Sequence, residues 1–303
     1  MNEFSSAMMF AERNKHLITY VLHCKSKNYL KPIGSKTRMI QNSFIFLDKI
    51  SSKTEERLWE QGIVNWNIFL RQHGIEGISP SRKLFYDTQL LKAREELFRN
   101  NAPFFAKILP SGEVWRLYDF FSEEACFLDI ETSGYYGDIT VVGLYDGFET
   151  KMFVKGFNLD LKRLAEVLKN YKMIVTFNGS SFDLPVIERY CKNTIPGIPH
   201  LDLRHACSKL GLTGGLKKIE RDLGIKRDES VNEMSGSEAV YLWNMWIATK
   251  NQKYLDLLIK YNEEDIMNLK PIADYCYKHL KHKVYQQRIL KAQECKRIFH
   301  GVA

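Results

Sequence analysis

Residues 125–132 of this 303-residue chain read ACFLDIET and carry the first clear signal of a sheet. It is a short run of aromatic, β-branched and other apolar residues followed by turn signals, which is typical of a buried strand. Asp129 and Glu131 are two positions apart, so on a strand both carboxylates point to the same face. Two like charges a few Å apart repel, and a bound cation commonly compensates them. A strand end whose acids face water would give the same pattern, so this motif alone leaves both interpretations open.

Four more strand-like runs follow: DITVVGLY (138–145), ETKMFV (149–154), MIVTFN (173–178) and HLDL (200–203). The first three runs of the chain are joined by short segments with Gly and Asp turn signals, which predicts antiparallel hairpins. A helical pattern over 159–171 leads to the fourth strand, and the element order becomes β-β-β-α-β-α-β. Later segments with apolar stripes at helical spacing predict a helical C-terminal part (214–224, 236–250 and 254–280).

Before residue 119 the periodicity is mostly helical, as in 54–72 and 87–101. We therefore expect a helical N-terminal module (1–118), an α/β domain (119–281) and a basic C-terminal helix or tail (282–303). The segment 44–63 resembles a helix-hairpin-helix element, but Ser51 and Ser52 stand where its hairpin usually has glycine, which argues against close approach to phosphate. The large apolar side chains of this part are expected in the core (Trp59, Trp66, Phe69, Trp115 and Leu117).

The basic composition suggests an anionic partner, although many soluble proteins without one are also modestly basic. The net charge is +8 and 26% of residues are charged, and nucleic acid is the leading candidate for an anionic partner.

Six scattered cysteines without metal-type spacing predict reduced thiols. The N-terminus carries charges where a signal peptide would be apolar, and no run of about 18 apolar residues occurs, so we expect a cytoplasmic protein without a membrane span. The basic stretch 281–300 fits a solvated helix or an arm that contacts phosphate.

Two further acids stand in motifs of their own. In 174–190, IVTFNGSSFDLPVIERY, we expect a strand to end at Asn178 and a helix to begin near Ser180 or Ser181, which places Asp183 at the helix start. There it would be either a metal ligand or a simple complement to the helix dipole. In 260–269, KYNEEDIMNL, Tyr261 precedes Asp265 by one helical turn, so both lie on one face. An ordinary exposed polar stripe would look the same.

Together, FLDIET (127–132), FNGSSFDLP (177–185) and YNEED (261–265) resemble the three acidic motifs of the DEDD exonuclease superfamily, within the ribonuclease-H-like fold. Tyrosine four residues before the last Asp matches the tyrosine form, DEDDy, and the histidine form would need His where Lys260 stands. Three other segments, HLDLRH, GGLKKIERDLGI and GSEAVYLW, are similar to YprB-type exonuclease domains. The resemblance covers about residues 120–280 and implies an α/β fold with a five-stranded mixed sheet flanked by helices.

The resemblance also implies a site and an activity. Asp129, Glu131, Asp183 and Asp265 would hold two divalent cations, Mg²⁺ or Mn²⁺, for 3′-to-5′ hydrolysis of DNA or RNA. Tyr261 would orient the attacking water. The candidate substrate contacts are Thr132, Asn178, Phe182 and Lys217. Each of three candidates also has a structural interpretation. Asn178 could stabilise its loop, Phe182 could pack in the core, and the segment of Lys217 could simply begin a helix.

Other polar residues and other functions fit the same sequence. We interpret Asp202 as a helix cap or supporting group, and His200 and His205 as structural, because they lack metal-ligand spacing to a third residue. Two alternatives to the exonuclease remain: a catalytically silent nucleic-acid-binding scaffold of this fold, and a structure-specific endonuclease. Four retained acids weigh against the scaffold because they repel one another.

Overall fold

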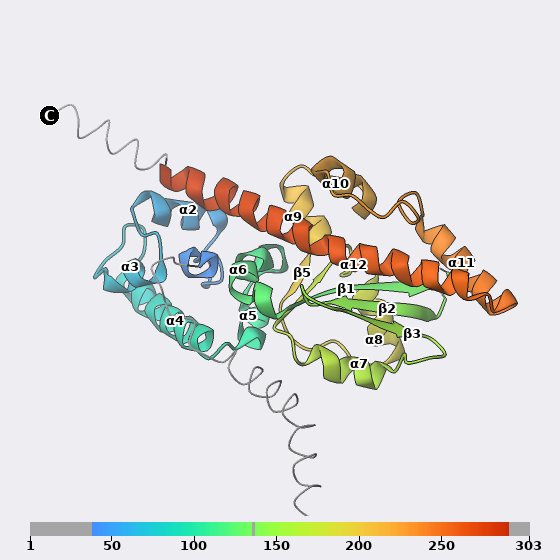
Figure 1. The fold of residues 1–303 in the computed structure, drawn as a ribbon. Coiled ribbons are helices and arrows are strands. Elements are labelled where there is room, and N and C mark those ends of the chain that lie inside the picture. Colours follow the sequence, from blue (N-terminus) through green and yellow to red (C-terminus); the bar gives the residue numbers. More distant parts are fainter. Residues whose placement is uncertain (1–37, 135–136, 291–303) are drawn as a thin grey trace, which may run out of the picture. The chain divides into compact units, whose positions relative to one another are not determined.

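The computed structural model describes residues 38–134 and 137–290, and its centre is one mixed sheet (Figure 1). The strands are β1 (Ala125–Thr132), β2 (Ile139–Tyr145), β3 (Thr150–Val154), β4 (Met173–Thr176) and β5 (His200–Asp202). Their spatial order is β3-β2-β1-β4-β5. β1, β4 and β5 run parallel, whereas β2 is antiparallel to both β1 and β3. The expected five strands, their hairpins and the mixed sheet are confirmed.

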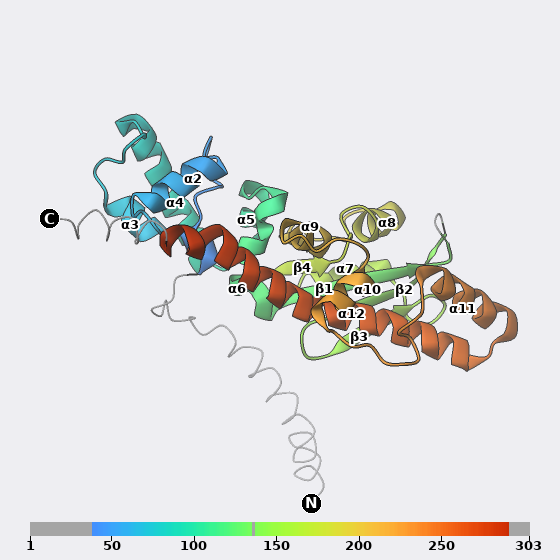
Figure 2. The same ribbon diagram turned by 90° about the horizontal axis from the view of Figure 1, so that it is seen from above.

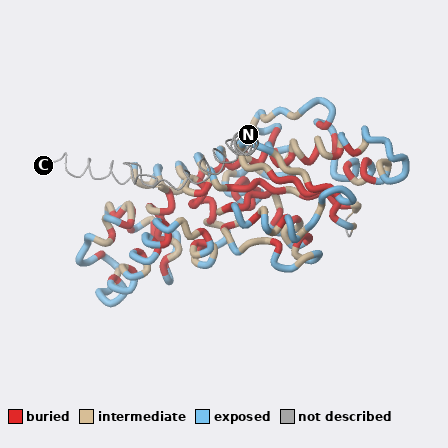
Figure 3. Tube along the Cα trace, turned by 60° about the horizontal axis from the view of Figure 1, so that its bottom comes forward, coloured by how far each residue is buried: buried red, intermediate tan, exposed pale blue. Residues whose placement is uncertain are grey.

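The alternation of side chains along β1 divides its contacts between two helical layers. Cys126, Leu128 and Ile130 pack in a cluster with α7 (Leu161–Leu168) and α8 (Asp183–Tyr190). The opposite face of the sheet packs against α11 (Gly236–Thr249) and α12 (Gln252–Lys281). Figure 3 shows the strands as the buried centre between these layers. The remaining helices of this half are α9 (Leu203–Lys209) and α10 (Leu216–Leu223).

The described residues before β1 are helical, as expected. They form η1 (Met39–Asn42), α2 (Ser52–Glu60), α3 (Trp66–Arg71), α4 (Pro80–Phe98), α5 (Ala102–Ile108), η2 (Ser111–Leu117), α6 (Tyr118–Phe121) and η3 (Ser122–Glu124). Residues 43–50 are turns and bends instead of the first helix of a helix-hairpin-helix. Ser51 caps α2 by accepting a hydrogen bond from the amide of Thr54. The large apolar side chains named above are buried here, as predicted.

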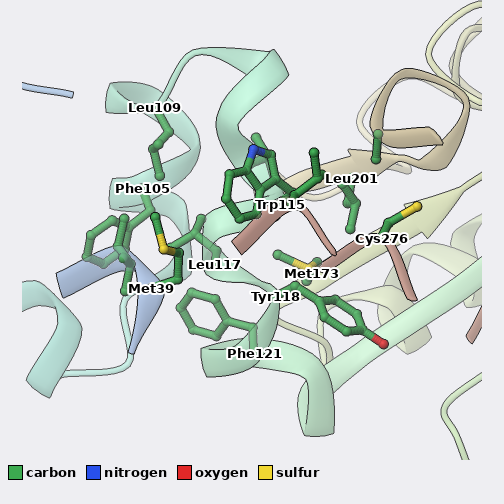
Figure 4. Close-up of a cluster of buried hydrophobic side chains, with 14 of the residues drawn as sticks. Met39, Phe105, Leu109, Trp115, Leu117, Tyr118, Phe121, Met173, Leu201 and Cys276 are labelled. Carbon is green, nitrogen blue, oxygen red and sulfur yellow. The ribbon is translucent and has the colours of Figure 1, made fainter. Parts of the chain in front are cut away.

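One hydrophobic cluster connects these helices to the sheet and to α12. It includes Phe105, Trp115, Met173, Leu201 and Cys276, which Figure 4 draws together. Figures 1 and 2 both show α12 running from beside α11 to the N-terminal helices. The helix continues through the π-helical turn η4 (His282–Gln286), while residues 291–303 and the N-terminal stretch lie outside the described residues. The domain boundaries at 118 and 281 remain predictions. Across residues 38–134 and 137–290, none of the helices combines the length and the apolar character of a membrane span.

A buried ion pair fixes the turn before α2. Glu55 Oε1 accepts hydrogen bonds from the amides of Phe44 (2.6 Å) and Ile45 (3.0 Å). Its Oε2 lies 3.0 Å from Arg116 Nη1, and the two side chains are 1% and 2% exposed. Removal of one partner would leave a buried charge without compensation, which costs more than the pair itself contributes.

We therefore expect Arg116→Met to lower the free energy of unfolding by about 3 to 5 kcal/mol, as measured by urea denaturation. Lys169→Met is the matched control, because Lys169 pairs with Glu166 where both side chains are exposed. It should cost roughly 1 kcal/mol or less. Equal effects of the two substitutions would contradict a structural role for the buried pair.

Candidate metal centre

Three carboxylates converge between β1 and α12. Asp129 and Glu131 leave the face of β1 opposite Leu128 and Ile130, and Asp265 comes from α12. One carboxylate oxygen from each of Asp129, Glu131 and Asp265 lies within 4.8 Å of the others. Hard oxygen donors at this spacing are the kind of ligand that Mg²⁺ and Mn²⁺ take. These three residues could therefore hold a divalent cation.

Asp183 lies beside this group and points to the backbone of β1. Its Oδ1 accepts a hydrogen bond from the amide of Ile130 at 3.0 Å, between the two acids of the strand, and the residue is 2% exposed. The negative charge of Asp183 contributes to the raised pKa of Asp129. The structure thus brings three of the four predicted acids into one group and places the fourth next to it.

The start of α8 differs from the sequence prediction. β4 ends at Thr176, and the helix begins at Asp183, two or three residues later than expected. Asn178 has a left-handed backbone (φ 67°), and Asp202 accepts hydrogen bonds from the amides of Asn178 and Ser180. These bonds hold residues 178–181 in a turn, so the helix cannot begin there. Pro185 still falls in the first turn of α8, where proline is tolerated.

Burial raises the pKa of every acid in the cluster, and repulsion from nearby carboxylates adds to it. Burial is the main cause for Asp129 and Glu131, and the charges of the neighbouring acids add to it. Burial raises the pKa of Asp183 to about 7, although the amide of Ile130 favours the charged form. It raises that of Asp265 to about 6, although Arg227 opposes the shift. Without a cation, the ionised cluster is therefore electrostatically unfavourable.

Two polar neighbours were missed by the sequence prediction. The side-chain nitrogen Nδ2 of Asn262 donates to Asp129 Oδ2 at 2.8 Å. Asn262 stands three residues before Asp265 on the same helix, a spacing that could have revealed it. Room for it comes from Gly143, where a Cβ atom would lie 2.1 Å from Asn262 Oδ1.

Arg227 is the second missed neighbour, and its guanidinium pairs with Asp265. It follows α10 in a segment without regular structure. No local pattern predicts its contact with a helix 38 residues away.

Tyr261 lies in the same region and is 7% exposed. Its pKa is raised by burial and then by the negative charges of Asp265, Glu131 and Asp129. The phenol is therefore a proton donor at neutral pH and not a base. Lys217 Nζ lies 5.0 Å from the centre of the Tyr261 ring and donates to the carbonyls of Val231 (3.3 Å) and Asn232 (3.1 Å).

The other predicted substrate contacts have structural partners. Thr132 is buried, and its hydroxyl donates to the carbonyl of Gly134 at 2.8 Å. Asn178 Oδ1 accepts from Arg204 Nη1 at 2.8 Å. Phe182 is half-buried and packs against the cluster under α7 and α8. Their roles toward substrate remain predictions.

Asp202 caps α9 by accepting from the amide of Arg204, as predicted. His200 Nε2 lies 2.8 Å from Thr176 Oγ1, and burial lowers the pKa of this histidine to about 4. His205 is exposed, with Nε2 3.5 Å from Ser180 Oγ. In the described residues no metal-type group includes either histidine.

A model of the RNase H superfamily matches residues 126–277, half of the chain. This range contains the whole acidic cluster together with Tyr261. The chain therefore belongs to the RNase H superfamily. No curated protein matches it. The tyrosine-type, YprB-like subfamily stays a prediction.

The raised pKa values predict how pH affects the metal-free protein. The unfolded chain ionises Asp183 and Asp265 near their ordinary pKa of 3.8, whereas the folded protein does so only near 7 and 6. Between about pH 4 and 7 the folded state binds more protons, so these groups make stability fall as pH rises. After treatment with EDTA and its removal, the melting temperature of the metal-free protein should fall from pH 5 to pH 8, and saturating Mn²⁺ should restore it at pH 8.

Asp129→Asn removes one charge from the cluster and serves as the comparison. Its metal-free melting temperature should depend less on pH, and apo stability at pH 8 should stay level or rise. A loss of about 1 to 3 kcal/mol with or without metal would instead identify Asp129 as a structural hydrogen-bond acceptor.

Proposed function

We propose that this member of the RNase H superfamily is a divalent-metal-dependent 3′-to-5′ exonuclease that hydrolyses phosphodiester bonds of DNA or RNA. The convergence of Asp129, Glu131 and Asp265, with Asp183 alongside, is the observation that carries the proposal. Nucleic acid is the proposed partner, and the excess of basic residues favours binding of a polyanion. The N-terminal helical module is proposed to help hold the strand.

The donor set fits Mg²⁺ or Mn²⁺. All its ligands are hard carboxylate oxygens, and among the residues that the structure describes no Cys or His that would favour zinc joins them. The carboxylates are largely buried and repel one another, so a bound cation would relieve an existing electrostatic cost. We propose two ions, which when bound activate water and stabilise the leaving 3′-oxygen.

The residues of the chain then have distinct roles. Asp129, Glu131 and Asp265 would hold the ions, and Asp183 would join them by giving up or sharing its bond to the amide of Ile130. Asn262 orients the carboxylate of Asp129. Tyr261 keeps its proton and orients the attacking water by a hydrogen bond.

The proposed substrate contacts are Thr132, Asn178, Phe182 and Lys217. Phe182 is only half-buried at the start of α8, and we propose that its accessible part stacks on a terminal base. Lys217 would approach phosphate after releasing the carbonyls of Val231 and Asn232. The scaffold alternative is disfavoured because a binding module has no need for buried acids that repel one another.

Tyr261→Phe tests the positioning role. The substitution keeps the ring and its packing, so nuclease activity should fall by roughly 10² to 10⁴ while affinity for strand and Mn²⁺ stays similar. Tyr275→Phe, on the same helix but outside the site, is the matched control and should keep full activity. Full activity of Tyr261→Phe would make Tyr261 a packing residue only.

The exonuclease proposal predicts polarity. With Mn²⁺, a 5′-labelled single strand should shorten stepwise, and a 3′-labelled one should release its label as a mononucleotide at once. A circular single strand should survive. Cleavage of the circle as fast as of the linear strand would support the endonuclease alternative. The same assays with DNA and with RNA strands would show which polymer is hydrolysed.

A further inference from the structure

Arg227 lies in a buried network of charges beside the acidic cluster. Its guanidinium forms a bidentate ion pair with Glu220 of α10: Nε donates to Oε2 at 2.6 Å, and Nη2 donates to Oε1 at 2.7 Å. The same Nη2 also donates to Asp265 Oδ1. Asn268 of α12 donates to Glu220 Oε1 at 3.1 Å. The side chains of Arg227 and Glu220 are each 2% exposed, so water screens these charges little.

This arrangement pairs Arg227 with two carboxylates through Nε and Nη2, but not through Nη1, which carries two of its five N–H donors. Nη1 is buried and has no hydrogen-bond partner among the described residues. A buried donor without a partner is unfavourable, so the hydrogen bonds of Arg227 are incomplete while it contacts Asp265. Glu220 holds the Nε side of the guanidinium independently of Asp265. The arginine can therefore give up Asp265 and remain paired.

We propose that Arg227 is an internal cation that occupies the Asp265 side of the metal centre and exchanges there with a divalent ion. The inference rests on the proposed metal-dependent function. An oxygen of Asp265 that accepts from Arg227 is a poorer ligand, because a positive charge already compensates it. Metal binding at Asp265 then competes with the arginine, and Glu220 is a positioning residue that retains Arg227 when the ion binds.

Glu220 and Arg227 therefore act on metal affinity with opposite signs. Without the negative charge of Glu220, Arg227 has only Asp265 as a charged partner and pairs with it more strongly, so the ion should bind more weakly. Loss of both charges removes the competitor without leaving a buried acid unpaired, so the ion should bind more tightly. A simple structural pair would not predict this reversal, because removal of either charge would only loosen the site.

The test measures Mn²⁺ binding by isothermal titration calorimetry, without nucleic acid, for the full chain at pH 7.5. Glu220→Gln/Arg227→Gln should bind Mn²⁺ roughly tenfold more tightly than the wild type, and Glu220→Gln several-fold more weakly, since one adjacent charge shifts such equilibria by at least that factor. Lys260→Gln is the control. Lys260 is on α12 and pairs with Asp228 where both are exposed, so its loss should change affinity less than about twofold.

The outcomes separate this inference from the proposed function. If the wild type binds Mn²⁺ but the double variant binds it equally or more weakly, the exchange is wrong and Arg227 merely positions Asp265. If neither protein binds Mn²⁺, the metal-dependent function itself fails. Should the double variant not fold, Glu220→Gln decides alone, because unchanged or tighter binding in that variant overturns the inference.

Discussion

Repulsion among buried carboxylates is the constraint on which the site depends. Asp129 and Glu131 leave β1 on the same face as the contacts with α12, which itself contributes Asp265. A sheet face covered by a helix normally excludes charge, because burial favours the neutral form. The fold accepts this cost in the C-terminal half of the central strand and surrounds it with specific donors: the amide of Ile130, the side chain of Asn262 and the guanidinium of Arg227.

Contacts at two places along α12 fix its approach to the sheet. Near the cluster, Gly143 on β2 lies opposite Asp129 in the ladder, and its missing side chain admits Asn262. In the C-terminal third of α12, Tyr118 donates to Asp274 at 2.8 Å, and Tyr277 donates to Asp119 at 2.6 Å. A long helix held at two places keeps its register, and this register decides whether Asp265 meets the acids of β1. The helices before the sheet thus support the site without contributing an acid to it.

Much of this could be predicted from the sequence because the signals are local. Alternation in ACFLDIET places two carboxylates on one face, and the helical spacing of Tyr261 and Asp265 places them together on α12. The five strands and the later helices follow from the same periodicities. The turn at residues 178–181 could not be predicted, because Asp202, more than 20 residues away, supplies the bonds that delay α8.

Which residues are acids, and which faces of their elements those acids occupy, can be predicted from the sequence because side-chain direction repeats with a fixed local period. How the acids are compensated depends on tertiary contacts. The tertiary structure set Asp183 against the amide of Ile130, outside the three-residue group, and it brought Arg227 and Glu220 from the region of α10 to Asp265. Electrostatic contacts of this kind depend on distances between elements far apart in the chain, and no residue period records such distances.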